Sequence, residues 1–337
     1  MTPALHRNLI TDIEGIAVGN ADDATICSGV TVILPPPGST AAVDVRGGGA
    51  GTQETDVLSL DGSIEEAHAV VLSGGSAFGL AAAAGVRDWL ASKGIGFPVR
   101  EARVPIVAEA ILFDLLNGGQ KDALSDAYVR LARQACLAAS QEGFALGSAG
   151  AGYGAATANL RGGLGSASAD LADGLKVAAL VAANPVGTVT MGTTPHFWAH
   201  PFERNGEFGG LGPPAAWSAP VSPPLLKIRV GESTTIAVVA TNAVLDKRAA
   251  RRLAILAQTG LARAIHPVHT PLDGDVVFAL ATNKIPLKEP LGDLAVLGSA
   301  AADALARAIA RAVYAAAPTP TGWVGPPAYT ERFPNPA

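Results

Sequence analysis

The chain has 337 residues, of which 49% are hydrophobic and 16% charged, and its formal net charge at pH 7 is −5. So much apolar side chain excludes a disordered chain, and a chain of this length can bury most of it in a core. A nucleic-acid-binding protein is also excluded by the charge pattern, because the short basic set Lys247-Arg248 and Arg251-Arg252 is typical of a solvated helix face. Apolar runs are broken by Gly, Asp or Arg well before the roughly 18 residues that a membrane-spanning helix needs, so no membrane span is expected.

The two cysteines, Cys27 and Cys136, lie far apart in an otherwise cysteine-free chain. Two free, buried thiols in a reducing compartment are expected, rather than a disulfide. The segment up to Asn8 contains no apolar stretch of the kind found in signal peptides. A soluble cytoplasmic protein is therefore expected.

Strand signals dominate the first part of the chain. Runs of apolar and β-branched residues predict four strands, at residues 9–19, 25–34, 41–46 and 67–72. Apolar residues at helical spacing predict two helices, at residues 77–92 and 122–141. Glycine-rich segments follow at residues 147–152 and 162–165.

The second part of the chain begins with a predicted buried strand at residues 175–183. Residues 192–224, rich in Gly, Pro and Trp, are predicted to form a long surface excursion that supplies an interface or a pocket wall. A further buried strand begins at Thr234. The last predicted elements are a helix at 246–258 capped by Asp246, a strand at 276–281, a helix at 294–315 and an irregular tail from Pro318.

The balance of these elements indicates the fold class. Strands outnumber helices in both halves, and the helices are few and long. This pattern predicts an α+β fold of layered sheets covered by helices, rather than a regular alternation of strand and helix. No segment is long or polar enough to be a linker, so residues 1–337 are expected to form a single domain.

Two motifs that often carry chemistry are incomplete. The Gly47–Gly51 loop lacks the spacing and the downstream acid of a nucleotide-binding fingerprint, so its glycines are expected to serve turns and close packing. Ser76 follows a strand and opens a helix, like a nucleophile elbow, but Phe78 stands where that motif needs glycine. The helix start could still offer backbone N–H groups to an anion.

The histidines form two pairs by spacing, His196 with His200 and His266 with His269. Such spacings occur in metal sites. However, no acid lies between His196 and His200 as a helical zinc motif requires, so ordinary polar packing is favoured over a metal.

Polar side chains also mark two strand ends. Asn184 closes the predicted strand before Pro185, and its amide can either fill a turn or donate to an oxyanion. Asp273 and Asp275 flank Gly274 just before the next strand. They can either form a turn or orient an amine or hydroxyl at the sheet end.

Thr234 has two interpretations. It can simply open a strand after the turn at Gly231-Glu232-Ser233, or the chain can cut itself there and leave Thr234 with a free amine. A Thr hydroxyl is a weak nucleophile without an adjacent base, and the amine of an N-terminal Thr can be that base. Its reference pKa of about 8 leaves a useful neutral fraction at working pH. The residues alone leave both interpretations open.

Six segments together resemble the DmpA-like peptidase family of L-aminopeptidase/D-Ala-esterases, β-peptidyl aminopeptidases and nylon-oligomer hydrolases. The similarity covers most of the chain, from near residue 8 to beyond 280. The segments are 8–12, 43–48, 72–80, 182–187, 233–242 and 269–275, and the Gly-Gly-Ser-Ala-Phe-Gly-Leu run at 74–80 is the most specific of them.

The resemblance implies a four-layer αββα sandwich of the N-terminal-nucleophile type, made from a self-cleaved precursor. Cleavage between Ser233 and Thr234 would give an α chain 1–233 and a β chain 234–337. By the same resemblance, Thr234 matches the nucleophile and Asn184 the oxyanion-stabilising residue. Asp273 and Asp275 match the pair that positions the nucleophile and its amine, and two aspartates there favour the nylon-hydrolase-like branch.

Two positions depart from the family pattern. Asn159 stands where the family commonly carries a lysine, with Arg161 two residues further on. Phe113 lies in the region, 110–116, where relatives place a tyrosine near the active site. A lysine that assists catalysis and a second oxyanion donor are therefore missing from the expected places.

The resemblance implies an amide hydrolase that needs no metal or organic cofactor. Its substrates would be small peptides, amino-acid amides or oligoamides, and its assembly a homotetramer of processed protomers. Two other classes remain open. One is an acyltransferase of the ornithine-acetyltransferase type, although the expected Ala-Thr cleavage motif is missing, and the other is a catalytically silent binding or assembly protein.

Overall fold

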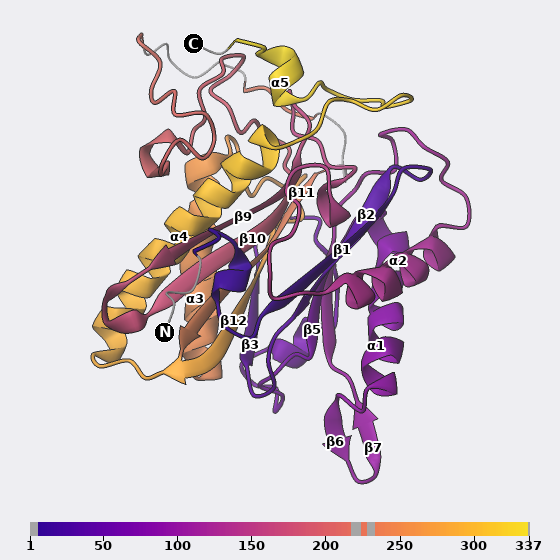
Figure 1. Cartoon of the computed structure of the whole chain (residues 1–337), viewed down its shortest axis with the longest axis vertical. Coiled ribbons are helices and arrows are strands. Elements are labelled where there is room, and N and C mark those ends of the chain that lie inside the picture. The colour runs from indigo at the N-terminus through magenta and orange to yellow at the C-terminus, as the bar shows by residue number, and fades with distance from the viewer. Residues whose placement is uncertain (1–5, 217–223, 228–232, 336–337) are drawn as a thin grey trace.

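Two five-stranded sheets form the centre of the computed structural model, which describes residues 6–216, 224–227 and 233–335 (Figure 1). The first sheet has the strand order β1-β2-β5-β8-β4. All neighbours in it are antiparallel except β5 and β8, which run parallel. The strands are β1 (Ala17–Asp23), β2 (Ser28–Leu34), β5 (Ala69–Ser73), β8 (Val107–Ile111) and β4 (Gly51–Gln53).

The second sheet carries the residues of interest and has the order β3-β12-β11-β10-β9. Its central pair, β11 and β12, runs parallel, and β10 lies antiparallel to β11 on the other side. The strands are β3 (Thr40–Val45), β12 (Val276–Ile285), β11 (Thr234–Ala243), β10 (Lys176–Asn184) and β9 (Gly163–Asp170). Every residue of β11 is buried, which explains the run of apolar and β-branched side chains from Thr234 to Thr241.

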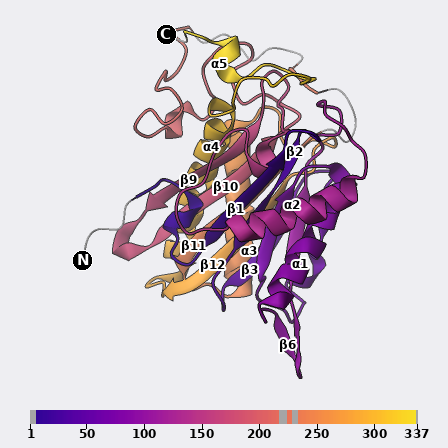
Figure 2. The ribbon, with the colours of Figure 1, turned by 45° about the vertical axis from the view of Figure 1, so that its right-hand side comes forward.

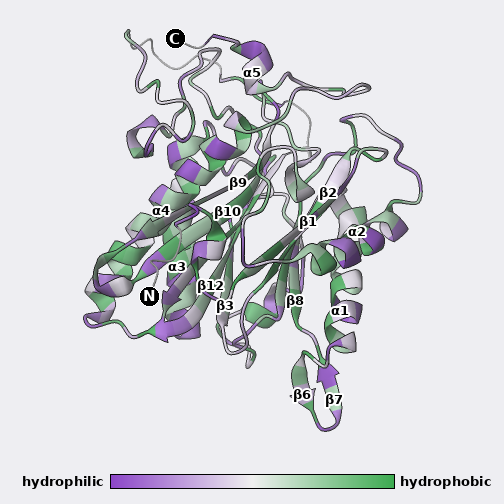
Figure 3. Ribbon diagram, viewed as in Figure 1, coloured by the Kyte–Doolittle hydropathy of each residue, from purple (hydrophilic) through white to green (hydrophobic). Residues whose placement is uncertain are grey.

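Helices cover the outer face of each sheet, so four layers are stacked (Figures 1 and 2). Helices α1 (Ala82–Ser92) and α2 (Leu124–Ala138) pack on the first sheet. Helices α3 (Lys247–Ala264) and α4 (Pro290–Tyr314) pack on the second. A further apolar core lies between the two sheets. The hydropathy colouring follows this plan, with apolar residues concentrated on the strands and mixed faces on the outer helices (Figure 3).

Short elements complete the described chain. The hairpin β6 (Phe97–Val99) and β7 (Ala102–Val104) projects beyond the end of α1 (Figure 1). The other short elements are η1 (Ile10–Asp12), η2 (Asp56–Leu58), η3 (Ser76–Ala81), η4 (Gly150–Gly152), η5 (Ala172–Gly174), η6 (His200–Phe202) and α5 (Tyr329–Arg332). No helix in the described part is both long and apolar enough to cross a membrane.

The expected layering is confirmed, and most predicted elements are present. Asp246 caps α3 as predicted, since its Oδ1 accepts the N–H of Ala249 at 2.7 Å. Cys27 and Cys136 are free and buried. Strand β8, in contrast, was not expected from the sequence, because its five residues carry the buried Glu109 at their centre.

The predicted strand at 9–19 is wrong in its first half. Residues 10–12 form η1, whose backbone is held by the Asp12 carboxylate accepting the N–H groups of Arg7 at 2.9 Å and Leu9 at 3.2 Å. Gly15 then turns the chain with a φ of +89°, and β1 begins only at Ala17. These local hydrogen bonds outcompete the extended conformation that the apolar residues favour.

The sequence also failed to indicate strand β9, because its glycines resemble a loop. The structure shows why they are there: a Cβ on Gly165 would lie 1.9 Å from the carbonyl oxygen of Ala308 in α4, and one on Gly163 would lie 2.3 Å from that of Ala312. The glycines thus let α4 approach the strand backbone directly.

Substituting Gly165 with alanine tests this close approach. Gly165→Ala should lower the free energy of unfolding by about 3 kcal/mol, because the added methyl overlaps the backbone of α4 and the helix must move. Urea unfolding measures the change. Gly143→Ala is the matched control, since a Cβ at Gly143 meets nothing within 4 Å, and it should unfold like the wild type.

The region predicted as a surface excursion is partly core in residues 192–216, the part that the structure describes. Phe197 and Phe208 are buried and pack edge to face at 5.3 Å between ring centroids. Tyr329 of the tail stacks on Phe197 at 5.0 Å. The prediction of an irregular tail overlooked α5 and this contact.

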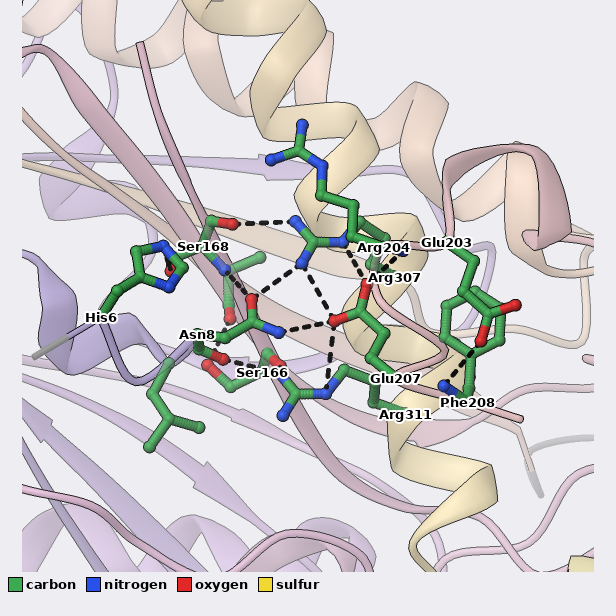
Figure 4. Close-up of polar contacts among 12 residues, drawn as sticks. His6, Asn8, Ser166, Ser168, Glu203, Arg204, Glu207, Phe208, Arg307 and Arg311 are labelled. Atoms are coloured by element: carbon green, nitrogen blue, oxygen red, sulfur yellow. Dashed lines mark hydrogen bonds and ion pairs between the residues drawn. The ribbon is translucent and has the colours of Figure 1, made fainter. Parts of the chain in front are cut away.

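A buried ion-pair network ties the same region to α4 and to the N-terminal segment (Figure 4). The Glu207 carboxylate accepts from Arg307 and, at 2.6 Å, from Nδ2 of Asn8, and Arg311 lies 3.6 Å from it. The side chains of Glu207 and Arg307 are only 8% and 2% exposed. Burial by itself would raise the pKa of Glu207, but the hydrogen bond and charge of Arg307 outweigh it and the pKa is lowered.

Glu207→Gln should therefore lower the free energy of unfolding by about 3–5 kcal/mol at pH 7, because it leaves the buried Arg307 and the partly buried Arg311 without their counter-charge. Since the lowered pKa stabilises the fold only while Glu207 is ionised, wild-type stability should also fall as the pH drops below the ordinary glutamate pKa, and less so in the variant. Denaturant unfolding at pH 7 and pH 4 measures both. Glu142→Gln is the control. The Glu142 side chain is 73% exposed, so loss of its ion pair with Arg7 should change the free energy of unfolding little.

Candidate active site

Thr234 is the first residue of β11 and is 3% exposed. Its Oγ1 donates a hydrogen bond to the carbonyl oxygen of Ser233 at 2.6 Å. The N–H of Gly274 donates to the same oxygen at 3.0 Å. The hydroxyl therefore lies against the peptide group that precedes its own residue, and that carbonyl is already polarised by a second donor. The predicted turn at Gly231 and Glu232 lies outside the described residues.

Asn184, the last residue of β10, lies directly opposite Thr234 in the antiparallel ladder. It is 1% exposed, and its side chain is fixed at both ends. Oδ1 accepts the N–H of Ala156 at 2.9 Å, and Nδ2 donates to the carbonyl oxygen of Phe113 at 3.1 Å. The sheet register thus brings the predicted amide and the predicted nucleophile together.

Asp273 and Asp275 are fully buried at the start of β12, on the other side of Thr234. Ser233 pairs with Asp273 through a parallel bridge. Asp273 accepts the N–H groups of Val186 at 3.0 Å and Thr270 at 2.9 Å. Asp275 accepts the N–H of Thr235 at 2.8 Å. Asp275 thus holds the backbone next to Thr234 and Asp273 the two adjoining loops, and neither has a hydrogen bond to the Thr234 hydroxyl within the described residues.

The two carboxylates influence one another. Burial raises the pKa of Asp273, and the neighbouring Asp275 charge raises it further, against the hydrogen bonds from Thr270 and Val186. Neighbouring negative charges repel one another, and a positive charge placed beside them relieves that repulsion. The two carboxylates together therefore favour binding of a nearby ammonium group.

His269 joins this group, although the sequence suggested it only as a weak metal candidate and as the first residue of the matching segment 269–275. Its Nδ1 lies 2.8 Å from Oδ2 of Asp275, and its backbone has a φ of +56°. The left-handed conformation is uncommon outside glycine and asparagine and is held here by the Asp275 carboxylate, which also accepts the His269 N–H at 3.2 Å. His266 instead pairs through its backbone with Thr188.

Lys227 is the second residue that sequence reasoning missed. Its Nζ donates to Oδ1 of Asn184 at 3.1 Å, to the Asn184 carbonyl oxygen at 3.0 Å and to that of Ala156 at 2.6 Å. The only signal in the sequence is that Lys227 is the one lysine between Lys176 and Lys247. It lies 43 residues from Asn184 in the chain, so no local motif connects the two.

A cavity of about 210 Å³ opens beside this cluster. Asn184 and Lys227 lie in its wall. The other described lining residues come from three places: 113–117 after β8, 154–158 after η4, and Val324, Gly325 and Pro326 of the tail. No residue of 192–216 is among them, so the predicted pocket wall from that region is not found here.

A larger cavity of about 780 Å³ lies at the other end of the second sheet, around Val244 and Leu245. It is lined mainly by apolar side chains with Arg248, Arg251 and Arg252. Because β11 runs from Thr234 to Ala243, this cavity is separated from Thr234 by the length of the strand, roughly 30 Å. We place the candidate site at the smaller cavity, which contains Asn184.

Asn159, the first departure from the family pattern, and Arg161, two residues further on, are both engaged with neighbouring segments. Asn159 donates to the carbonyl oxygen of Gly192 at 2.9 Å and to Thr190 at 3.2 Å. Arg161 is buried, donates to the carbonyl oxygen of Ala317 at 2.9 Å and stacks over Trp323 at 4.5 Å. Both side chains therefore hold neighbouring loops and the tail in place.

Phe113 contributes its backbone: its carbonyl oxygen orients Asn184, and the residue lines the cavity. Ser76, with a φ of +51°, donates its N–H to the carbonyl oxygen of Leu112 at 2.9 Å and opens η3. His196 contacts the carbonyl oxygen of Gly212 at 3.0 Å.

The glycine loop at 47–51 packs against the Asp273–Asp275 turn, as its close-packing interpretation predicts. The Gly49 N–H donates to the carbonyl oxygen of Asp273 at 2.8 Å. A Cβ on Gly47 would lie 2.3 Å from the backbone nitrogen of Asp275. The glycine loop therefore packs directly against the backbone of the Asp273–Asp275 turn and holds it in place.

The four-layer αββα sandwich defines a protein of the N-terminal-nucleophile-hydrolase fold. Solved structures agree. The L-aminopeptidase D-Ala-esterase/amidase from Ochrobactrum anthropi, described as a variant of that fold, superposes with a TM-score of 0.71 at 20% identity, covering 97% of this chain and 93% of that one. A β-aminopeptidase from Burkholderia sp. gives 0.67 at 23% identity, with the same coverage.

The chain belongs to peptidase family S58, whose pattern matches residues 8–323. An uncharacterized aminopeptidase of Mycobacterium tuberculosis (strain ATCC 25618 / H37Rv) is 42% identical over 349 aligned residues, which cover 97% of this chain and 98% of the relative. A 6-aminohexanoate-oligomer endohydrolase of Paenarthrobacter ureafaciens is 29% identical over 295 residues, 82% of this chain and 75% of that enzyme. The chain is thus a hydrolase of peptide or amide bonds.

Proposed function

We propose that the chain is an autoprocessed amidohydrolase that cleaves itself between Ser233 and Thr234 and then uses Thr234 as an N-terminal nucleophile. The observation that carries this proposal is the 2.6 Å hydrogen bond from the Thr234 hydroxyl to the carbonyl oxygen of Ser233. It means that the nucleophile already lies beside the bond to be cut, so little reorganisation is needed before attack.

In the self-cleavage step, Thr234 Oγ attacks the carbonyl carbon of Ser233. The negative charge that develops on the carbonyl oxygen is stabilised by the Gly274 N–H, 3.0 Å away. The hydroxyl proton passes to the Thr234 nitrogen as the C–N bond breaks, which leaves an ester on Oγ and a free amine. Water then hydrolyses the ester, releasing the Ser233 carboxylate and restoring the Thr234 hydroxyl.

In the substrate reaction, the Thr234 amine takes the proton of Oγ as Oγ attacks a substrate amide carbon. The Asn184 amide, opposite Thr234 in the sheet, binds the oxyanion, a contribution of about 3–4 kcal/mol for one such donor. The protonated amine then gives its proton to the leaving amine. Water, deprotonated by the same amine, hydrolyses the acyl-enzyme. Asp273 and Asp275 keep the first residues of β11 in place and balance the charge of the Thr234 ammonium.

The substrate class follows from the cavity and the relatives. A volume of about 210 Å³ is below the range of roughly 300–1,000 Å³ for drug-sized ligands, so it fits one small acyl unit. Small peptides, amino-acid amides and oligoamides of short amino acids have such units. The names of the relatives, aminopeptidase and 6-aminohexanoate-oligomer endohydrolase, fall within this range.

A cytoplasmic homotetramer of processed protomers is part of the proposal. The two free, buried cysteines support a reducing compartment. The exposed apolar side chains around the larger cavity, such as Leu291 at 86% and Leu60 at 56% exposure, offer surface for assembly. Light scattering after size-exclusion chromatography measures the assembly state.

Mass spectrometry of the purified protein tests the central claim. Two chains are expected, ending at Ser233 and beginning at Thr234, together with hydrolysis of a panel of short L-, D-, β- and ω-amino amides. Added hydroxylamine separates hydrolysis from acyl transfer, because a transferase would yield mainly hydroxamate. A single intact chain with full amidase activity would overturn the proposal.

A further inference from the structure

The Asn184 amide, which we propose binds the substrate oxyanion, has the ammonium group of Lys227 against its oxygen atom. Nζ of Lys227 lies 3.1 Å from Oδ1 of Asn184 and also donates to two backbone carbonyl oxygens, those of Asn184 and Ala156. The Lys227 backbone N–H donates to the carbonyl oxygen of Val186 at 2.9 Å. Main chain and side chain together thus anchor Lys227 at the end of β10.

This contact determines how Asn184 is oriented. Oδ1 receives two donors, Lys227 Nζ at 3.1 Å and the Ala156 N–H at 2.9 Å. Neither donor can face an NH₂ group, so the two together fix Nδ2 on the opposite side, where it donates to the carbonyl oxygen of Phe113. The positive charge of Lys227 beside Oδ1 also draws electron density from the amide nitrogen toward the oxygen, which makes the N–H groups of Asn184 stronger donors.

We propose that Lys227 is a positioning residue that holds and polarises the Asn184 amide for the substrate reaction, and that it takes no part in self-cleavage. The inference rests on the proposed function. The division follows from the contacts, because among the described residues the Ser233 carbonyl accepts from Gly274 and Thr234 and not from Lys227. The two reactions therefore use different donors for their oxyanions.

Two other lysines of the described chain, the buried Lys247 and the partly buried Lys121, bind elsewhere. Nζ of Lys247 donates to the carbonyl oxygen of Gly62 at 2.8 Å, and Nζ of Lys121 donates to Asn117 at 3.0 Å. Lys227 is thus placed to assist catalysis, the role that the family resemblance assigned to a lysine at position 159. Asn159 at that position is turned to Thr190 and Gly192.

Lys227→Met is the first test, because methionine keeps much of the length and removes the charge. The variant should still separate into two chains. Its kcat on the best amide of the panel should fall about 10- to 100-fold, as when a partner that orients a catalytic group is removed, while KM changes little. Lys247→Met is the matched control: it loses a buried lysine with a backbone hydrogen bond far from the site and should keep the wild-type kcat.

Two further readouts separate positioning from a merely structural role. In an Asn184→Ala background, Lys227→Met should cause no further loss of kcat, because Lys227 acts through that amide. In Lys227→Cys, alkylation with 2-bromoethylamine rebuilds an ammonium of similar length and should restore kcat. The native thiols are poor competitors, because burial raises the pKa of Cys27 and that of Cys136, the latter to about 12.

The outcomes are distinguishable. Processed Lys227→Met with unchanged kcat overturns this inference and leaves the proposed function intact. The same holds for additive losses in the Asn184→Ala background, for an uncleaved chain in either single variant, and for alkylation that restores nothing. An uncleaved but active wild type overturns the proposed function, and this inference with it.

Discussion

Thr234→Ala is expected to leave the chain in one piece and to abolish amide hydrolysis. The substitution removes the only hydroxyl that contacts the Ser233 carbonyl in the described chain. Without Oγ there is no ester intermediate, so neither the self-cleavage nor the acyl-enzyme can form. Mass spectrometry after purification should give the full-length mass, and activity should fall to background. Thr234→Ser keeps the hydroxyl and should still be cleaved.

Thr235→Val is the matched control for Thr234→Ala. Thr235 is adjacent and fully buried, and its hydroxyl has no hydrogen-bond partner in the described chain. Valine has nearly the same shape, so it removes a buried, unsatisfied polar atom at no steric cost. Thr235→Val should therefore be cleaved and active, with equal or greater stability. If Thr235→Val stays intact while Thr234→Ala is cut, the nucleophile is the other threonine.

The sequence indicated the strand ends at Thr234 and Asn184, but not how they lie relative to one another. A β-branched run beginning at Thr234 indicates a buried strand, and Asn184 before Pro185 marks a strand end, and both signals are local. That Asn184 lies opposite Thr234 depends on the pairing of β10 with β11, which connects segments far apart in the chain. The same holds for Ser233 beside Asp273.

The elements that the sequence did not reveal have a common cause. Gly165 makes β9 resemble a loop, and it is there for contact with α4, which no local pattern can show. Lys227 looks like an isolated surface charge until the fold places it on Asn184. The tail after Pro318 looks irregular, although Val324 and Pro326 line the cavity. In each case a tertiary contact overrides the local propensity.

Asp275→Asn is expected to have the second largest effect, slowing self-cleavage and lowering kcat/KM about 10²- to 10⁴-fold. Each carboxylate oxygen of Asp275 serves a different partner: Oδ1 accepts the Thr235 N–H at 2.8 Å, and Oδ2 lies 2.8 Å from Nδ1 of His269. Oδ2 also accepts the backbone N–H of His269 at 3.2 Å, and asparagine has one acceptor oxygen, so its NH₂ group must face a backbone N–H on one side. The start of β11 is then displaced, and the charge that we propose balances a Thr234 ammonium is lost.

The time course of precursor loss on denaturing gels and the kinetics of the processed fraction measure the two effects separately. Asp246→Asn is the control, because the same substitution at the start of α3 keeps the helix cap, which asparagine forms as well as aspartate. Urea unfolding of both variants shows whether the loss of rate follows a loss of fold. The Asp275 carboxylate contacts the backbone of Thr235 and not the Thr234 hydroxyl. Wild-type rates in a folded Asp275→Asn protein would therefore contradict the prediction, because they would show that the position of this backbone limits neither reaction.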